Sequence, residues 1–92
     1  MSESELPAVV LAQSGNYSVV QVSDRRYPAI AVQGDSLKVL HEAVEELATC
    51  LRAGDLEEAE FPLMEIQETI TSLKLLYEET LTKAGIQLPY VN

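Results

Sequence analysis

The passage that decides the fold is Tyr27-Pro28-Ala29-Ile30-Ala31-Val32-Gln33-Gly34-Asp35-Ser36-Leu37. Its first half alternates larger and smaller apolar side chains, which is typical of a strand with two different faces. Proline lacks an N–H, so this strand begins at or just after Pro28 or lies on a sheet edge there. Gly34 ends the strand, and Asp35 or Ser36 offers an oxygen that caps the first turn of a helix. The passage therefore predicts one change from strand to helix at Gly34.

Two further strands are predicted before this passage. Residues 8–12 and 17–22 are rich in β-branched side chains, and the turn between them contains Gly15 and Asn16, either of which takes a positive φ. A second polar turn, residues 23–26, leads to the third strand. Short turns join neighbouring strands in antiparallel fashion. Residues 6–33 are therefore predicted to form a three-stranded antiparallel meander.

Two helices are predicted after Gly34. The first spans residues 36–53 and the second residues 55–84, with a break or kink near Pro62 because proline removes a helical hydrogen bond. Gly54 ends the first helix, and Asp55 caps the second with the Asp-to-Glu spacing of a capping box. Residues 86–92 form an extended tail. The apolar stripe of the first helix is Leu37, Leu40, Val44, Leu47 and Leu51, and that of the second is Leu56, Ala59, Leu63, Ile66, Ile70, Leu73 and Tyr77.

The predicted fold is α+β, in the order β-β-β-α-α, within one domain of 92 residues. The short link at Gly54-Asp55 makes the two helices an antiparallel hairpin. Some apolar residues fall outside the two stripes and exceed what a three-stranded sheet can cover: Val39, Met64, Leu75 and Leu76. A symmetric homodimer through the helices is the simplest arrangement that buries them. In the alternative arrangement, the second helix covers the sheet.

Charge limits the classes of partner. Fifteen acidic residues against six basic ones give a net charge of −9, spread along the chain, and the six bases are scattered. Direct binding to nucleic acid or to an anionic membrane surface needs clustered Lys and Arg, so both are disfavoured, whereas a basic protein partner fits. One cysteine and the absence of a signal-type apolar run near the start favour the cytoplasm.

No catalytic motif is recognisable. His41 and Glu45 are four residues apart on one helix, but zinc needs three or four ligands, so a surface histidine beside an acid is favoured. Cys50 fits a buried thiol of the core better than a reactive nucleophile. The acidic clusters lie on helices rather than in a calcium-binding loop. The sequence therefore predicts no metal site, no cofactor and no enzyme.

Arg25, Arg26 and Tyr27 are the most distinctive polar group in an otherwise acidic chain. Two guanidinium groups beside a tyrosine are able to anchor a carboxylate or a phosphate. The simpler interpretation is a polar turn whose arginines pair with acids such as Asp24 or Asp35. Together with Gln33 and Asp35, these residues form the candidate binding set.

The run Arg26-Tyr27-Pro28 followed by Gln33-Gly34-Asp35-Ser36-Leu37 resembles a family of small uncharacterised bacterial proteins. Its pattern is arginine, an aromatic residue, proline, apolar residues and then Gln-Gly-Asp-Ser/Thr-Leu, and it implies no established activity. The chain also resembles HicB-type antitoxins, in which a strand ends in Gly-Asp-Ser/Thr-Leu before a helix. This chain departs from that family by continuing with Lys38-Val39-Leu40 and by having no DNA-binding extension.

These observations favour a small acidic protein-protein interaction module, non-enzymatic and dimeric. One alternative is an antitoxin-like or immunity-like protein that neutralises a basic partner. Another is a small-ligand-binding domain or enzyme with a pocket between sheet and helices, to which Arg25, Arg26 or His41 contributes.

Overall fold

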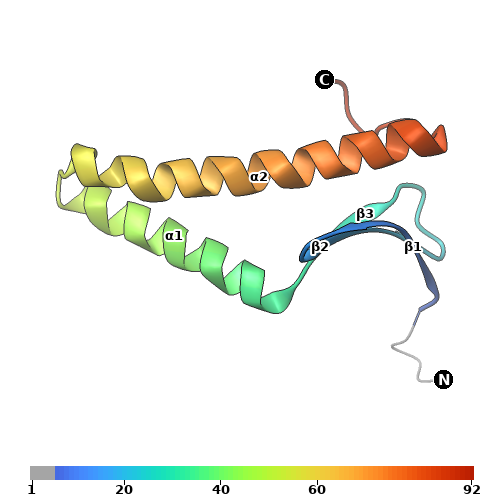
Figure 1. Ribbon diagram of the computed structural model, residues 1–92, viewed down its shortest axis with the longest axis horizontal. Helices are drawn as coiled ribbons and strands as arrows, with labels where there is room; N and C mark the ends of the chain where they lie inside the picture. The colour runs from blue at the N-terminus through green and yellow to red at the C-terminus, as the bar shows by residue number, and fades with distance from the viewer. Residues whose placement is uncertain (1–5) are drawn as a thin grey trace. The chain divides into compact units, whose positions relative to one another are not determined.

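The computed structural model describes residues 6–92 and contains three strands followed by two helices (Figure 1). The elements are β1 (Ala8–Ser14), β2 (Tyr17–Val22), β3 (Ala29–Val32), α1 (Gly34–Arg52) and α2 (Leu56–Ala84). The strands form one antiparallel sheet in the order β1-β2-β3, so the predicted α+β fold is confirmed. The chain divides into two compact units. The sheet unit is the chain up to Val32 with Leu73–Asn92, and the hairpin unit is Gln33–Ser72.

The sheet follows the predicted meander. A two-residue turn joins β1 to β2, and Gly15 at its first position has a φ of +56°, which is unfavourable for residues with a Cβ. β3 begins directly after Pro28, as the missing N–H requires. In the centre of the sheet, Val19 of β2 pairs with Ile30 of β3. Val19 is fully buried, so this pair marks the covered face of the sheet.

β1 contains an irregularity that the sequence did not predict. Its register with β2 shifts between Val10 and Ala12, which leaves Leu11 as an extra residue in a β-bulge. In a regular strand, consecutive side chains point to opposite faces. Because of the bulge, Leu11 and Ala12 both pack against the same core.

The core of the sheet unit lies between the sheet and the C-terminal half of α2. Val19, Tyr77 and Leu81 are its buried members, and the side chains packed around them are Leu11, Ala12, Ile30, Leu76, Ile86 and Leu88. The Tyr77 hydroxyl donates a hydrogen bond of 2.7 Å to the carbonyl of Pro28, which fixes α2 to the start of β3. Burial raises the pKa of Tyr77, and Tyr27 nearby raises it further. Thus α2 covers the sheet, which was the predicted alternative arrangement.

The start of α1 differs from the prediction. The helix begins at Gly34, two residues before the predicted residue 36, and Gln33 is its N-cap residue without a side-chain cap hydrogen bond. The cap residue is therefore neither Asp35 nor Ser36, although Asp35 does supply an oxygen to an amide of the first turn, as predicted. Asp35 lies inside the first turn, where its Oδ1 accepts a 2.8 Å hydrogen bond from the Ser36 amide. Gln33, which is extended but follows the end of β3, leads directly into this helix.

The connection between the two helices lies close to its predicted position. α1 ends at Arg52, one residue before the predicted residue 53, and Gly54 follows with a φ of +72°. α2 begins at Leu56, where the Oδ1 of Asp55 accepts a 3.1 Å hydrogen bond from the Glu58 amide, as predicted for its cap. α2 continues through Pro62 to Ala84, so Pro62 does not break the helix, and the predicted alternative of a kink stays a prediction. No helix in the described part of the chain is long and apolar enough to cross a membrane.

The tail after Gly85 forms no strand, yet it is tied to α2. The ring of Tyr90 stacks on Tyr77 with centroids 6.4 Å apart, and its hydroxyl donates a 2.9 Å hydrogen bond to Oε2 of Glu78. Desolvation alone would raise the pKa of Glu78, but hydrogen bonds from Tyr90 and Asn92 and the Lys74 ammonium outweigh it. The pKa of Glu78 is therefore lowered.

The Glu78 contact predicts an effect of acid on the tail. The pKa of Glu78 is lower in the folded state than in the unfolded state, so its carboxylate stabilises the fold at pH values above the unfolded-state pKa. This contribution to stability is lost as the pH falls through the folded-state pKa. In Tyr90→Phe, we expect the pKa of Glu78 to rise toward its ordinary value, because one hydrogen bond to the ionised form is lost. A carbon-13 NMR titration of the Glu78 carboxyl group measures this; an unchanged pKa would refute the role of Tyr90.

Candidate interaction surfaces

The least exposed residues of the hairpin unit form one narrow stripe on each helix. Ala43 of α1 and Ala59 of α2 are buried, with exposed fractions of 3% and 5%. The other least exposed residues recur around them at three- and four-residue intervals, so each stripe runs along one side of its helix. The stripe of α1 is Leu40, Ala43, Leu47 and Cys50, and that of α2 is Ala59, Pro62, Ile66 and Thr69.

Six residues that the sequence predicted to be inside the hairpin are instead exposed. They recur every seven residues, which is about two helical turns, so each set of three forms a column along its helix. Their exposed fractions range from 36% to 69%. The predicted stripes are therefore corrected at these positions: Leu37, Val44 and Leu51 on α1, and Leu56, Leu63 and Ile70 on α2.

The two columns lie on the same side of the hairpin. On α1, Val44 directly follows the buried Ala43, and on α2, Leu63 directly follows the buried Pro62. Two antiparallel right-handed helices that face each other place residues with the same offset from their packed stripes on the same side. We call these six residues the apolar face of the hairpin. In the sequence, the apolar face corresponds to a second seven-residue repeat of apolar residues, next to the repeat of the buried residues.

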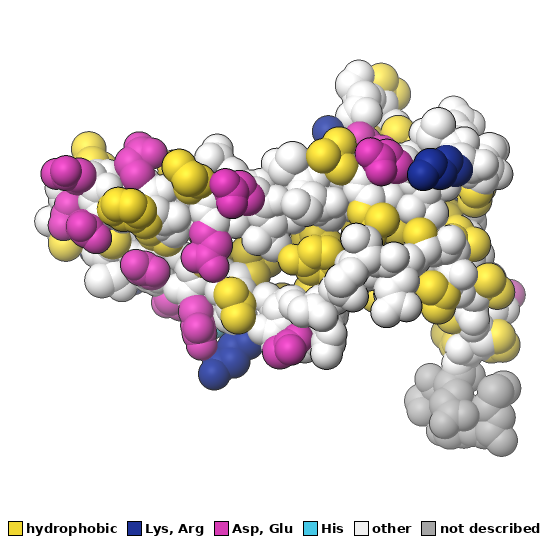
Figure 2. Space-filling model, viewed as in Figure 1, with side chains coloured by type: hydrophobic (Ala, Val, Ile, Leu, Met, Phe, Trp, Pro, Cys, Tyr) yellow, Lys and Arg dark blue, Asp and Glu magenta, His cyan; other side chains and the backbone are white. Residues whose placement is uncertain are grey.

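The hairpin unit also carries most of the charge of the chain. Between Gln33 and Ser72 there are ten acidic residues and two basic ones, a net charge of −8 out of the total of −9. Figure 2 shows many acidic side chains over α1 and the first half of α2, between hydrophobic ones. The charge is thus concentrated in one unit rather than spread along the chain. The sheet unit is nearly neutral, with five acidic and four basic residues.

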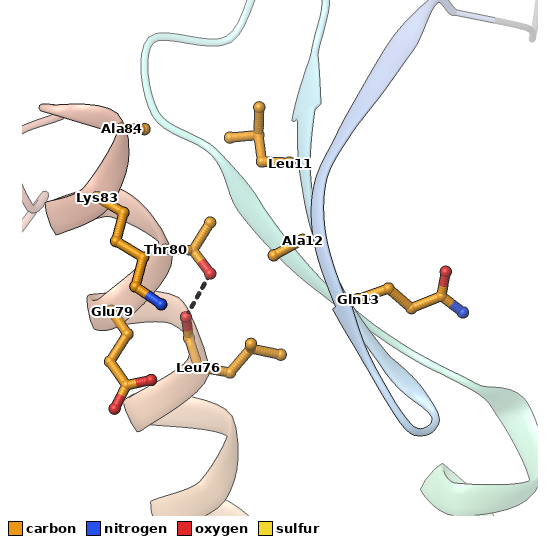
Figure 3. Close-up of a pocket in the computed structure, with 8 residues that line it drawn as sticks. All are labelled: Leu11, Ala12, Gln13, Leu76, Glu79, Thr80, Lys83 and Ala84. Carbon is orange, nitrogen blue, oxygen red and sulfur yellow. Dashed lines mark hydrogen bonds between the residues drawn. The ribbon is translucent and has the colours of Figure 1, made fainter.

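A groove of about 470 Å³ lies in the sheet unit between β1 and α2. Leu11 and Ala12 of β1 point toward α2, whereas Gln13 points away (Figure 3). The Thr80 hydroxyl is satisfied inside the helix, because it donates a 2.7 Å hydrogen bond to the Leu76 carbonyl. The remaining lining residues are Glu79, Lys83 and Ala84, and the groove is lined by no residue of β2 or β3. Neither Arg25, Arg26 nor His41, the predicted contributors to a pocket, lines this groove.

The predicted binding residues at the second turn belong to the sheet unit. The guanidinium carbon of Arg26 lies 5.2 Å from the ring centroid of Tyr27, a cation-π contact. The Arg25 carbonyl accepts a 2.8 Å hydrogen bond from Nε2 of Gln21. Within residues 6–92, the ion pairs involve Lys38, His41 and Lys74, so neither arginine pairs with an acid as the simpler interpretation expected.

Gln33 and Asp35, the other members of the candidate set, belong to the hairpin unit at the start of α1. The Gln33 carbonyl accepts the 3.0 Å hydrogen bond from the Leu37 amide that opens the helix, and Asp35 bonds to its neighbour. Both residues therefore have structural roles in the change from strand to helix. That the five residues bind a ligand stays a prediction.

His41 and Cys50 lie in environments without a sign of catalysis. Nε2 of His41 is 3.4 Å from Oε1 of Glu45, and both side chains are largely exposed. Cys50 is a half-buried free thiol, and desolvation, together with Asp55 and Glu46, raises its pKa. A raised pKa lowers the thiolate fraction that a nucleophile needs. In residues 6–92, no three His, Cys, Asp or Glu side chains are placed to hold a metal ion.

Comparison with known proteins gives a family but no activity. A family model described as "Family of unknown function (DUF6959)" matches residues 3–90. No curated protein and no solved structure matches the chain. The resemblance to a family of uncharacterised proteins is thus supported over nearly the whole chain, whereas the resemblance to HicB-type antitoxins stays a prediction.

Proposed function

We propose that this chain, which belongs to a family of unknown function, is a non-enzymatic protein-protein interaction module that binds a basic partner through the apolar face of its helical hairpin. The observation that carries this proposal is the coincidence of six exposed apolar residues with a net charge of −8 in the same 40-residue unit. Exposed apolar surface of this kind marks interaction sites, since water is a poor solvent for it.

The chemistry of the partner follows from the two properties of the unit. Antiparallel helices with an apolar face between them accept an amphipathic helix whose apolar side chains fill that face. The surrounding acids favour Lys and Arg on the flanks of the partner helix, and they accelerate its association by long-range attraction. Neutralising a basic toxin, as an antitoxin or immunity protein does, is one form that this binding takes.

A second copy of the chain is the competing occupant of the apolar face. Two hairpin units brought together repel each other, since each carries a net charge of −8. Salt separates the two cases, because it screens attraction and repulsion alike. Binding of a basic partner weakens as salt is added, whereas self-association through this face becomes tighter.

Capture from an extract of the native cell tests the proposal. The baits are the wild-type chain, the double variant Leu51→Ser/Leu56→Ser on the apolar face, and Leu75→Ser as the control. Leu51, Leu56 and Leu75 are each more than half exposed, with fractions of 54%, 69% and 51%. Losing two contacts that each bury part of a leucine raises the Kd of the partner by at least about tenfold.

We expect the wild type and Leu75→Ser to retain the same basic protein, and the double variant to lose it. Raising the salt from about 0.05 M to about 0.5 M releases this protein, because the Debye length falls to a few ångströms. Capture that persists in the double variant, or a partner that is held more tightly at high salt, would contradict the proposal.

A further inference from the structure

We propose that the outer edge of β1 pairs with the same edge of a second copy of this chain and joins two sheets into one of six strands. The sheet has two edges, since its strand order is β1-β2-β3. Natural proteins protect free edges with prolines, charged residues or short strands. β3 has these features, because it has only four residues and follows Pro28 and two arginines. β1 has seven residues and no charge.

The neutrality of the β1 region extends well beyond the strand. No charged residue occurs from Leu6 to Ser23, a stretch that contains both β1 and β2. Leu6, Val9 and Val10 are all exposed to 60% or more. An edge that combines apolar side chains with unpaired backbone groups is a template for a further strand.

The hydrogen-bond pattern shows which backbone groups of β1 are free. The Ser23 amide donates a 2.9 Å bond to the Pro7 carbonyl, so residue 7 faces β2. In an antiparallel pair, residues that bond to the neighbour alternate with residues whose N–H and C=O point away. Ala8 and Val10 therefore direct these groups outward, on the side of β1 where residues 6–92 add no further strand to the sheet.

An antiparallel pairing about a two-fold axis at Val9 satisfies these groups. Ala8 of each copy then exchanges backbone hydrogen bonds with Val10 of the other, and the two Val9 side chains meet at the axis. The axis is perpendicular to the sheet, so the α2 helices of both copies cover the same face. The interface is self-complementary, as a symmetric dimer requires.

The bulge at Leu11 places the two-fold axis beside the groove. Val9 faces the core side of the sheet, since it pairs with Gln21, two residues from the buried Val19, whereas Ala8 and Val10 face the opposite side. The bulge interrupts this alternation, so Leu11 and Ala12 both turn toward the core and line the groove between β1 and α2. The two Val9 side chains therefore meet on the face of the sheet that α2 covers.

Charge favours a second copy as the occupant of this edge. The groove carries one carboxylate, Glu79, and one ammonium group, Lys83, at its rim, so it does not repel an identical surface. The sheet unit as a whole has a net charge of −1, in contrast to −8 for the hairpin unit. Self-association at the β1 edge is thus independent of the partner proposed for the hairpin.

Sedimentation equilibrium of the full chain tests the dimer. The variant is Val9→Lys, which places two ammonium groups at the axis, and the control is Val91→Lys, which makes the same change at a residue that is 98% exposed. We expect the wild type and Val91→Lys to dimerise with a Kd below about 100 µM, and Val9→Lys to raise this Kd at least tenfold. A wild type that stays monomeric at about 1 mM, or a Val9→Lys variant that dimerises as tightly, would overturn the proposal.

Amide exchange of the wild type provides a test that does not depend on the folding of a variant. We expect the amide protons of Ala8 and Val10 to exchange slowly in a concentrated NMR sample and rapidly after dilution, because only the second copy protects them. The amide of Val9 faces β2 and serves as the internal control, since its protection does not depend on concentration. A dimer in which Ala8 and Val10 exchange rapidly would place the interface elsewhere, for instance on the hairpin.

Discussion

Leu81→Ala lowers the free energy of unfolding of the chain by about 3 to 4 kcal/mol. Leu81 is fully buried in the sheet-unit core, where it belongs to the same cluster as Val19 and Tyr77. The substitution removes the apolar contacts of three carbon atoms and leaves a cavity that the neighbouring sheet cannot fill. Urea denaturation followed by far-ultraviolet circular dichroism measures the loss.

Leu75→Ala is the matched control for this prediction. Leu75 lies on the same helix but is 51% exposed, so we expect its truncation to cost less than about 1 kcal/mol. Equal losses for the two variants would show that the C-terminal half of α2 does not cover the sheet through Leu81.

Tyr77→Phe lowers the free energy of unfolding by about 2 kcal/mol, although it removes a single oxygen atom. The Tyr77 hydroxyl donates its hydrogen bond to the Pro28 carbonyl in a buried position. Without the hydroxyl, this carbonyl loses its partner, and a buried acceptor without a partner costs more than an average hydrogen bond contributes. The same urea experiment measures this effect.

Tyr90→Phe is the matched control for Tyr77→Phe, because it also removes one hydroxyl group and keeps the aromatic ring. The Tyr90 hydroxyl also donates a hydrogen bond, but in an exposed position, so we expect its removal to change the stability by no more than about 0.5 kcal/mol. If Tyr77→Phe is as mild as Tyr90→Phe, then α2 is not anchored to the start of β3 through this bond.

The order of the elements could be predicted from the sequence because each local signal agreed with the global fold. Pro28 sets the start of β3, Gly54 and Asp55 set the connection between the helices, and the β-branched runs set the strands. The bulge at Leu11 could not be predicted, since a one-residue insertion leaves no trace in a short apolar run. The helix starts two residues before its predicted position because Asp35, the expected cap residue, lies inside the first turn and bonds to the next amide from there.

The packed stripes were only half predicted, for a reason that concerns residue size. Each helix carries two overlapping seven-residue repeats of apolar residues. Side-chain size favours burial of the repeat with the larger residues. The buried residues of the hairpin are instead small ones such as Ala43 and Ala59. The larger side chains next to them, including Val44 and Leu63, are then left partly exposed. This mismatch between size and burial is what reveals the apolar face.

Two surfaces with different properties result from this arrangement. The hairpin unit is acidic and exposes the apolar face, whereas the sheet unit is almost neutral and exposes the β1 edge. On the basis of charge, we propose a basic partner for the first surface and a second copy of the chain for the second. The proposed dimer through β1 would present two hairpins at once and would increase the avidity for a partner with two binding segments.

An NMR titration tests the central claim, that the apolar face of the hairpin is the docking surface. The probe is a synthetic amphipathic helix with leucines on one side and lysines on the other, added to the nitrogen-15-labelled full chain. We predict that the largest chemical-shift changes occur at the backbone amides of the apolar face, and that these changes become smaller as salt is added. Changes centred on β1 and its groove, or no changes up to about 1 mM probe, would contradict the account.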